Sequence, residues 1–101
     1  MLDTLEYTEV NGSKNEHDLT MYALSTCGFC KSAIAFLKEK DVSFRYVYID
    51  KLSADVKADT KEKLTERFNK RMLFPFLVVD AEKALPGFDE DIWMEELGVK
   101  E

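Results

Sequence analysis

The stretch that decides the fold is LTMYALSTCGFCKSAIAFL, residues 19–37. Its first six residues form an apolar run that predicts a short buried strand. Cys30, Ala33, Ile34 and Leu37 then recur at the spacing of one apolar helical face. The pair Cys27-Gly28-Phe29-Cys30 therefore lies where a strand ends and a helix begins.

The rest of the chain continues this alternation. Aromatic and β-branched residues predict a strand at 44–49, and Pro75 introduces another at 76–79. Residues 83–85 are a short hairpin partner for it. Ser53 and Asp89 are suited to cap the second and third helices, and Gly98 to end the last. The predicted order is βαβαββα, an α/β fold.

Composition limits the class of protein. A chain of 101 residues with 46% hydrophobic and 34% charged residues is expected to be one soluble globular domain. No apolar run approaches the ~20 residues of a membrane span, and residues 1–18 do not resemble a secretory signal. The net charge of −6 opposes nucleic-acid binding and favours a partner with a basic face. We expect a cytoplasmic monomer.

Residues 1–18 are interpreted as an acidic N-terminal arm that precedes a domain at 19–101. Alternating residues from Leu5 to Val10, followed by the turn signal Asn11-Gly12, permit an extra edge strand that folds back onto the next strand. A disordered terminal extension fits the arm equally well.

The cysteine spacing predicts dithiol chemistry. Only a thiolate attacks a disulfide, and the first turn of a helix favours negative charge there. We expect Cys27 to be the exposed nucleophile, with Gly28 leaving the turn unobstructed and Lys31 adding positive charge. Cys30, on the apolar face, is expected to be a buried resolving cysteine. Cys27 would attack a target disulfide, and Cys30 would release the reduced target.

Two other readings of the cysteines remain open. A zinc site needs about four ligands, whereas the chain offers Cys27, Cys30 and a single histidine, His17. We therefore expect no metal and a solvated His17. Two structural thiols within a helix are the other alternative, which would explain Cys30 but not a cysteine at the helix mouth.

Two distant segments are candidates for substrate binding. A cis peptide at Phe74-Pro75 would turn backbone groups outward to pair with an extended substrate. Only about 5–6% of such bonds are cis, so a trans proline at a strand start is the default. Backbone N–H groups in Gly87-Phe88-Asp89 are placed to bind a carboxylate, although a plain turn and helix cap explain them equally well.

Together, in this order, these motifs resemble the glutaredoxin family over residues 19–98. The resemblance implies a thioredoxin-like fold of four strands and three helices, with disulfide-containing proteins as substrates. It also implies glutathione as co-substrate, with no bound cofactor. The implied sheet is mixed, and Phe74-Pro75 stands where the family has its cis-proline. The implied contacts are the backbone of Phe74 and Pro75 and the turn Gly87, Phe88 and Asp89. Phe29, because it lies between the cysteines, is itself expected to be exposed and to offer the target an apolar contact.

The sequence departs from the glutathione-using pattern in three ways, one of which is the late turn Pro86-Gly87-Phe88 in place of Gly-Gly. Phe29 stands where such members carry Tyr, and Leu24 stands where they carry Lys. Gly87-Phe88 is similar to the small redoxins that serve ribonucleotide reductase and take electrons from thioredoxin reductase. Gly28-Phe29 is also similar to single-cysteine glutaredoxins, so the alternative function is a [2Fe–2S] cluster carrier.

Overall fold

The structure is a computed structural model, and it describes residues 7–98. In chain order it contains β1 (Thr8–Val10), β2 (Leu19–Ala23), α1 (Gly28–Glu39), β3 (Phe44–Tyr48), the 3-10 helix η2 (Ile49–Lys51), α2 (Ala54–Phe68), β4 (Phe76–Val79), β5 (Lys83–Pro86) and α3 (Glu90–Leu97). The five strands form one mixed sheet in the order β1-β3-β2-β4-β5. The predicted thioredoxin-like α/β class is confirmed, with one strand more than the four of the basic pattern.

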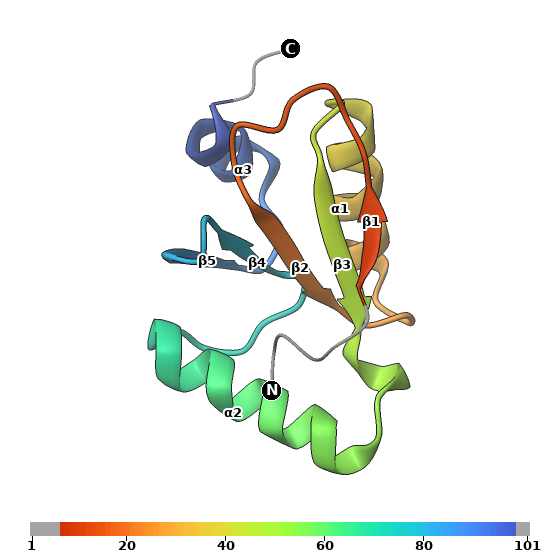
Figure 1. The fold of residues 1–101 in the computed structure, drawn as a ribbon, viewed down its shortest axis with the longest axis vertical. Coiled ribbons are helices and arrows are strands. Elements are labelled where there is room, and N and C mark those ends of the chain that lie inside the picture. The colour runs from red at the N-terminus through yellow and green to blue at the C-terminus, as the bar shows by residue number, and fades with distance from the viewer. Residues whose placement is uncertain (1–6, 99–101) are drawn as a thin grey trace.

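Helices cover both faces of this sheet (Figure 1). Leu19, Met21 and Ala23 of β2 pack into one hydrophobic cluster with α1 and α3, whereas Tyr22 packs with Leu64 of α2 in the second cluster. Every residue of β2 is buried, because this strand is central and has a helical layer on each side. This explains why residues 19–23 form a continuous apolar run rather than an alternating one.

The direction of the strands fixes where the loops meet. β2 runs parallel to β3 and antiparallel to β4, and β4 runs antiparallel to β5. The carboxyl ends of β2 and β3 therefore lie at the same edge as the start of β4. Figure 1 shows α2 crossing below this edge. None of the helices within residues 7–98 is long and apolar enough to span a membrane.

The N-terminal arm does contribute a strand, but its partner differs from the one expected. β1 pairs antiparallel with β3, with Glu9 opposite Arg45, and not with β2, the next strand in the chain. Gly12 continues the contact, since its N–H donates to Ser43 Oγ at 2.9 Å. A Cβ on Gly12 would lie 2.5 Å from the Asp41 carbonyl oxygen. Close packing against the α1–β3 loop therefore requires glycine here.

Local capping signals behave as predicted. The Ser53 and Asp89 side chains accept hydrogen bonds from Val56 N–H and Ile92 N–H, at 3.4 and 3.2 Å. Gly98 ends α3 in the left-handed region, with φ of 67°.

Candidate active site

Cys27 is the N-cap of α1, at the point where the chain leaves β2. Its backbone is extended, and its N–H donates to the Leu24 carbonyl at 3.2 Å. Its Sγ accepts the Cys30 N–H, also at 3.2 Å. The side chain is half-exposed. A sulfur in this position receives an unpaired N–H of the first helical turn, which is the environment that stabilises a thiolate.

Cys30 lies on the inner face of the same helical turn and is fully buried, with 0% of its surface exposed. Burial is the largest cause that raises the pKa of its thiol to about 12, followed by the hydrogen bond with Cys27. The predicted difference in exposure between the two cysteines is thus present. At neutral pH, Cys30 is a protonated thiol shielded from external disulfides.

The turn before Cys27 is anchored by a contact that sequence reasoning missed. Ser25 donates its N–H to Asp50 Oδ1 at 2.9 Å and its hydroxyl to Oδ2 at 2.5 Å. These two bonds hold the pKa of the Asp50 carboxyl below its usual value. The parallel register explains the pairing, because Ala23 lies opposite Tyr48, and Ser25 and Asp50 follow two residues later.

Phe74 and Pro75 immediately precede β4, and they lie at the same end of the sheet as Cys27, on the side of β2 away from β3. The Phe74–Pro75 bond is cis, as the family resemblance implies, whereas the base rate for such bonds alone favours trans. Phe76 lies opposite Tyr22, which brings the preceding Pro75 to the end of β2. Neither the N–H nor the carbonyl of Phe74 forms a hydrogen bond with another residue in the part of the chain the structure describes. Both are therefore available to an extended ligand.

The segment after β5 is hydrogen-bonded to Pro75, and several of its polar groups already have partners within the protein. The Gly87 N–H donates to the Pro75 carbonyl at 2.8 Å, and the Gly87 carbonyl accepts Trp93 Nε1–H at 3.2 Å. Phe88 packs edge-to-face on Phe36 and Trp93. The Gly87 N–H and the Asp89 carboxylate, which caps α3, are therefore occupied, whereas the N–H groups of Phe88 and Asp89 form no hydrogen bond within residues 7–98. Carboxylate binding by these two N–H groups stays a prediction.

The remaining predicted residues lie around the Cys27 turn. Phe29 is 69% exposed between the two cysteines, and Lys31 is exposed in the first turn of α1. A Cβ on Gly28 would meet nothing within 4 Å, so sterics do not require glycine at this position.

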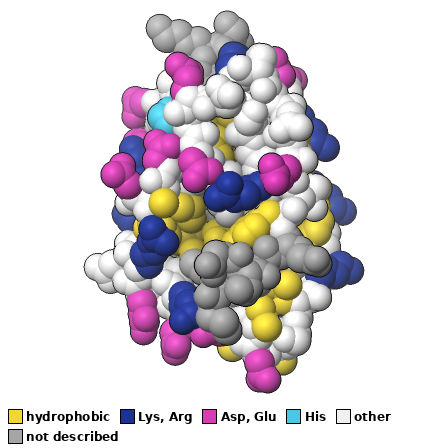
Figure 2. Space-filling view, viewed as in Figure 1, with side chains coloured by type: hydrophobic (Ala, Val, Ile, Leu, Met, Phe, Trp, Pro, Cys, Tyr) yellow, Lys and Arg dark blue, Asp and Glu magenta, His cyan; other side chains and the backbone are white. Residues whose placement is uncertain are grey.

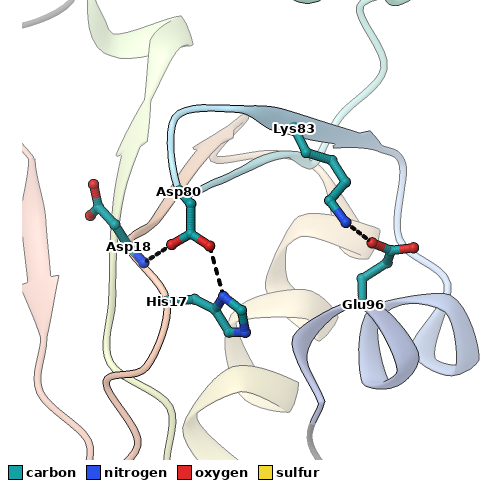
Figure 3. Close-up of polar contacts among 5 residues, drawn as sticks. All are labelled: His17, Asp18, Asp80, Lys83 and Glu96. Carbon is teal, nitrogen blue, oxygen red and sulfur yellow. Dashed lines mark hydrogen bonds and ion pairs between the residues drawn. The ribbon is translucent and has the colours of Figure 1, made fainter.

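His17 lies at the opposite end of β2 from the cysteines. Its Nδ1 is 2.8 Å from Asp80 Oδ2, while Asp80 Oδ1 accepts the Asp18 N–H at 2.7 Å (Figure 3). The histidine is thus half-buried and paired, not simply solvated. Because β2 separates it from Cys27 and Cys30, the three side chains do not form the zinc site considered above.

The comparisons with known proteins agree with this geometry. The family model described as Glutaredoxin matches residues 19–83. The crystal structure of a glutaredoxin from Methanosarcina mazei Go1 is 35% identical, with a TM-score of 0.79, and the match covers 93% of this chain and 89% of that one. Methanoredoxin from Methanosarcina acetivorans is 36% identical, with a TM-score of 0.76 and coverages of 86% and 90%. A buckwheat glutaredoxin–glutathione complex is 17% identical, with a TM-score of 0.62 and coverages of 83% and 73%, and shares the fold. The search of curated proteins gave no match.

Proposed function

Because the chain belongs to the glutaredoxin family of thiol–disulfide oxidoreductases, we propose that it reduces disulfides through a dithiol cycle between Cys27 and Cys30. The observation that carries this proposal is the asymmetry of the pair. Cys27 is half-exposed at the helix N-terminus, whereas Cys30 is buried behind it, with the pKa of its thiol raised to about 12.

The cycle moves two electrons from the dithiol to the target. The Cys27 thiolate attacks one sulfur of the target disulfide, and the other target sulfur leaves as a thiolate that takes up a proton. Cys30 then loses its proton and attacks Cys27 Sγ, which releases the second target thiol. The product is a Cys27–Cys30 disulfide, and an external donor must reduce it.

The order of these steps follows from the burial of Cys30. Burial is the largest cause that raises the pKa of its thiol, and the hydrogen bond with Cys27 is the second. A mixed disulfide at Cys27 removes the second cause, so Cys30 is easier to deprotonate at the step that needs its thiolate.

The substrate is proposed to align on the backbone of Phe74, whose N–H and carbonyl are available for strand-like pairing. In this proposal Pro75 shapes the segment, and the turn Gly87, Phe88 and Asp89 takes part in substrate binding through its backbone N–H groups. The Gly87 N–H joins this turn to the Pro75 carbonyl at 2.8 Å.

Two electron donors are proposed, glutathione and a thioredoxin-reductase-type enzyme, and the cytoplasm is the proposed compartment because its thiols are kept reduced. Leu24, an apolar side chain packed beside the second hydrophobic cluster, occupies the position of the glutathione-binding lysine. None of the similar proteins described above is named as an iron–sulfur protein, so the dithiol function is the one we retain.

A redox titration tests the cycle. The protein is equilibrated anaerobically in glutathione buffers, its free thiols are alkylated, and the products are weighed. Two alkylation sites should disappear together and reversibly. A midpoint of about −200 to −230 mV would indicate glutathione as donor, and one near about −270 mV a thioredoxin-type donor. Thiols that stay open throughout, or a single glutathione adduct, would overturn the dithiol cycle.

The two cysteine variants are matched controls for each other. Cys27→Ser should abolish turnover, because the attacking sulfur is lost. Cys30→Ser should instead trap mixed disulfides at Cys27, visible as an adduct by mass spectrometry. Turnover by Cys27→Ser equal to that of the parent protein would contradict the assignment.

A further inference from the structure

Two exposed apolar side chains belong to the segments that form the site. Residues 7–98 expose three large hydrophobic side chains, and Phe29 and Leu73 are two of them. Phe29, 69% exposed, stands between the cysteines, and Leu73, 46% exposed, immediately precedes Phe74. Scattered exposed hydrophobic residues are ordinary, but two in the segments of one site offer a partner an apolar contact there.

The charge near the site differs in sign from the charge of the whole chain. Residues 51–73, which lead from η2 through α2 to the Phe74 segment, contain seven Lys and Arg against four Asp and Glu. The chain as a whole carries −6. Figure 2 shows acidic side chains gathered over the upper part of the face in view, in line with the negative charge of the whole chain.

Four cations in the segments that lead to the site have no acidic partner among residues 7–98. Lys31 follows Cys30 in α1, and Lys61 Nζ lies 5.8 Å from the centre of the Phe74 ring. Lys70 and Arg71 are exposed in the stretch that leads to Leu73. Within residues 7–98 none of the four forms an ion pair, whereas Lys63 pairs with Asp59, and Lys83 with Glu96. Unpaired cations of this kind attract anionic groups.

We propose that Phe29, Leu73, Lys31, Lys61, Lys70 and Arg71 form a docking surface for a protein whose disulfide lies in an extended, acidic segment with an apolar side chain. The backbone of Phe74 pairs with that segment, the apolar side chain contacts Phe29 and Leu73, and its acidic side chains meet the cations. The inference rests on the proposed function and names its substrate class. The partner surface expected here is therefore acidic, whereas the net charge of −6 alone favours a basic partner surface.

The test uses disulfide-bridged peptides of equal length. One has Leu beside the disulfide and Glu flanks, one has Leu and Lys flanks, and a third has Ser in place of Leu with Glu flanks. Single-turnover reduction by the reduced protein is followed at low salt and at 1 M salt. The Glu-flanked Leu peptide should react about tenfold faster than the Lys-flanked one at low salt. The difference should vanish at 1 M salt, where the Debye length is about 3 Å. The Ser peptide should be slower than its Leu counterpart.

Charge-reversal variants locate the effect. In the double variant Lys61→Glu, Arg71→Glu the ratio of Glu-flanked to Lys-flanked rates should fall to one or below. The control Lys38→Glu, Lys40→Glu changes the net charge equally at the far end of α1 and should keep the parent ratio. Equal rates for the two peptides, an unchanged ratio in the surface variant, or an equal change in the control would overturn the docking surface. Failure to reduce any peptide would overturn the proposed function itself.

Discussion

The two ends of β2 are held by the same kind of contact. At the carboxyl end, the Asp50 carboxylate accepts the Ser25 N–H at 2.9 Å, and at the amino end the Asp80 carboxylate accepts the Asp18 N–H at 2.7 Å. Each carboxylate uses its second oxygen for a side chain next to the strand. Hydrogen bonds hold the pKa of both carboxyls below the usual range.

The Asp50 contact and the Asp80 contact have different roles. Ser25 begins the turn that carries Cys27, so the Asp50 contact determines where the nucleophile stands. Asp80 joins the N-terminal arm to the β4–β5 turn, with His17 as its second partner (Figure 3). The comparison indicates that the contact at the carboxyl end of β2 positions the reactive cysteine, whereas the contact at the amino end stabilises the fold.

The largest effect is expected for Asp50→Ala. The Ser25 turn loses both hydrogen bonds, and a nucleophile displaced by about 1 Å can lose up to ~100-fold in rate. We expect turnover of a disulfide substrate to fall roughly ten- to a hundredfold. Asp50→Asn should restore most of it, because the amide oxygen still accepts the Ser25 N–H. Steady-state kinetics and the alkylation rate of Cys27 measure both changes.

Asp80→Ala is the matched control, since it removes the same number of hydrogen bonds from the other end of β2. Its turnover at neutral pH should equal that of the parent protein, with folding checked by circular dichroism. Equal losses in Asp50→Ala and Asp80→Ala would show that the two contacts do not differ, and that Asp50 has no positioning role.

An intermediate effect is expected from substituting two glycines, Gly12 in the N-terminal arm and Gly28 at the start of α1. Gly12→Ala places a Cβ against the Asp41 carbonyl and should lower the free energy of unfolding by about 1–3 kcal/mol. Gly28→Ala meets open space at the start of α1 and should leave it unchanged or raise it by up to about 1 kcal/mol. Urea denaturation compares the two, and equal midpoints would contradict the assignment of close packing to Gly12.

The features that the sequence predicted correctly are local. The cysteine pair at a strand–helix junction, the Ser53 and Asp89 caps and the Gly98 stop each depend on a few consecutive residues. Local hydrogen bonding and helix periodicity decide such features, and so residue type and spacing suffice.

The features that it missed depend on register and tertiary contacts. The partner of β1 depends on the whole sheet, and the Asp50 contact depends on the alignment of two parallel strands. The cis isomer at Pro75 was implied only by the family resemblance, because residue type and spacing alone favour trans. The signal for Asp50 was present, because Ser25 and Asp50 each follow the end of a predicted strand. Without the register, nothing in the sequence joined them.

The smallest expected effect concerns the contribution of Asp80, at the amino end of β2, to the free energy of unfolding at low pH. The pKa of Asp80 is lowered first by its hydrogen bond with His17 and then by the Asp18 N–H, so the folded protein holds this carboxyl ionised at a pH where the unfolded chain has begun to bind a proton. The stabilisation is complete above the unfolded pKa of about 3.9, and is lost as pH falls through the lower folded pKa. Asp80→Asn should therefore flatten the fall in unfolding free energy between about pH 5 and pH 2.

The change should be modest, because the Asp80 side chain is 40% exposed and water screens its interactions. Urea denaturation at several pH values, with Asp91→Asn as a control carboxylate in the first turn of α3, measures the slope. Asp50→Asn should flatten the same slope, since its hydrogen bonds with Ser25 lower the pKa of Asp50. A variant at Asp80 that also lowered turnover would mean that the two ends of β2 are coupled, which the separate partners of Asp50 and Asp80 argue against.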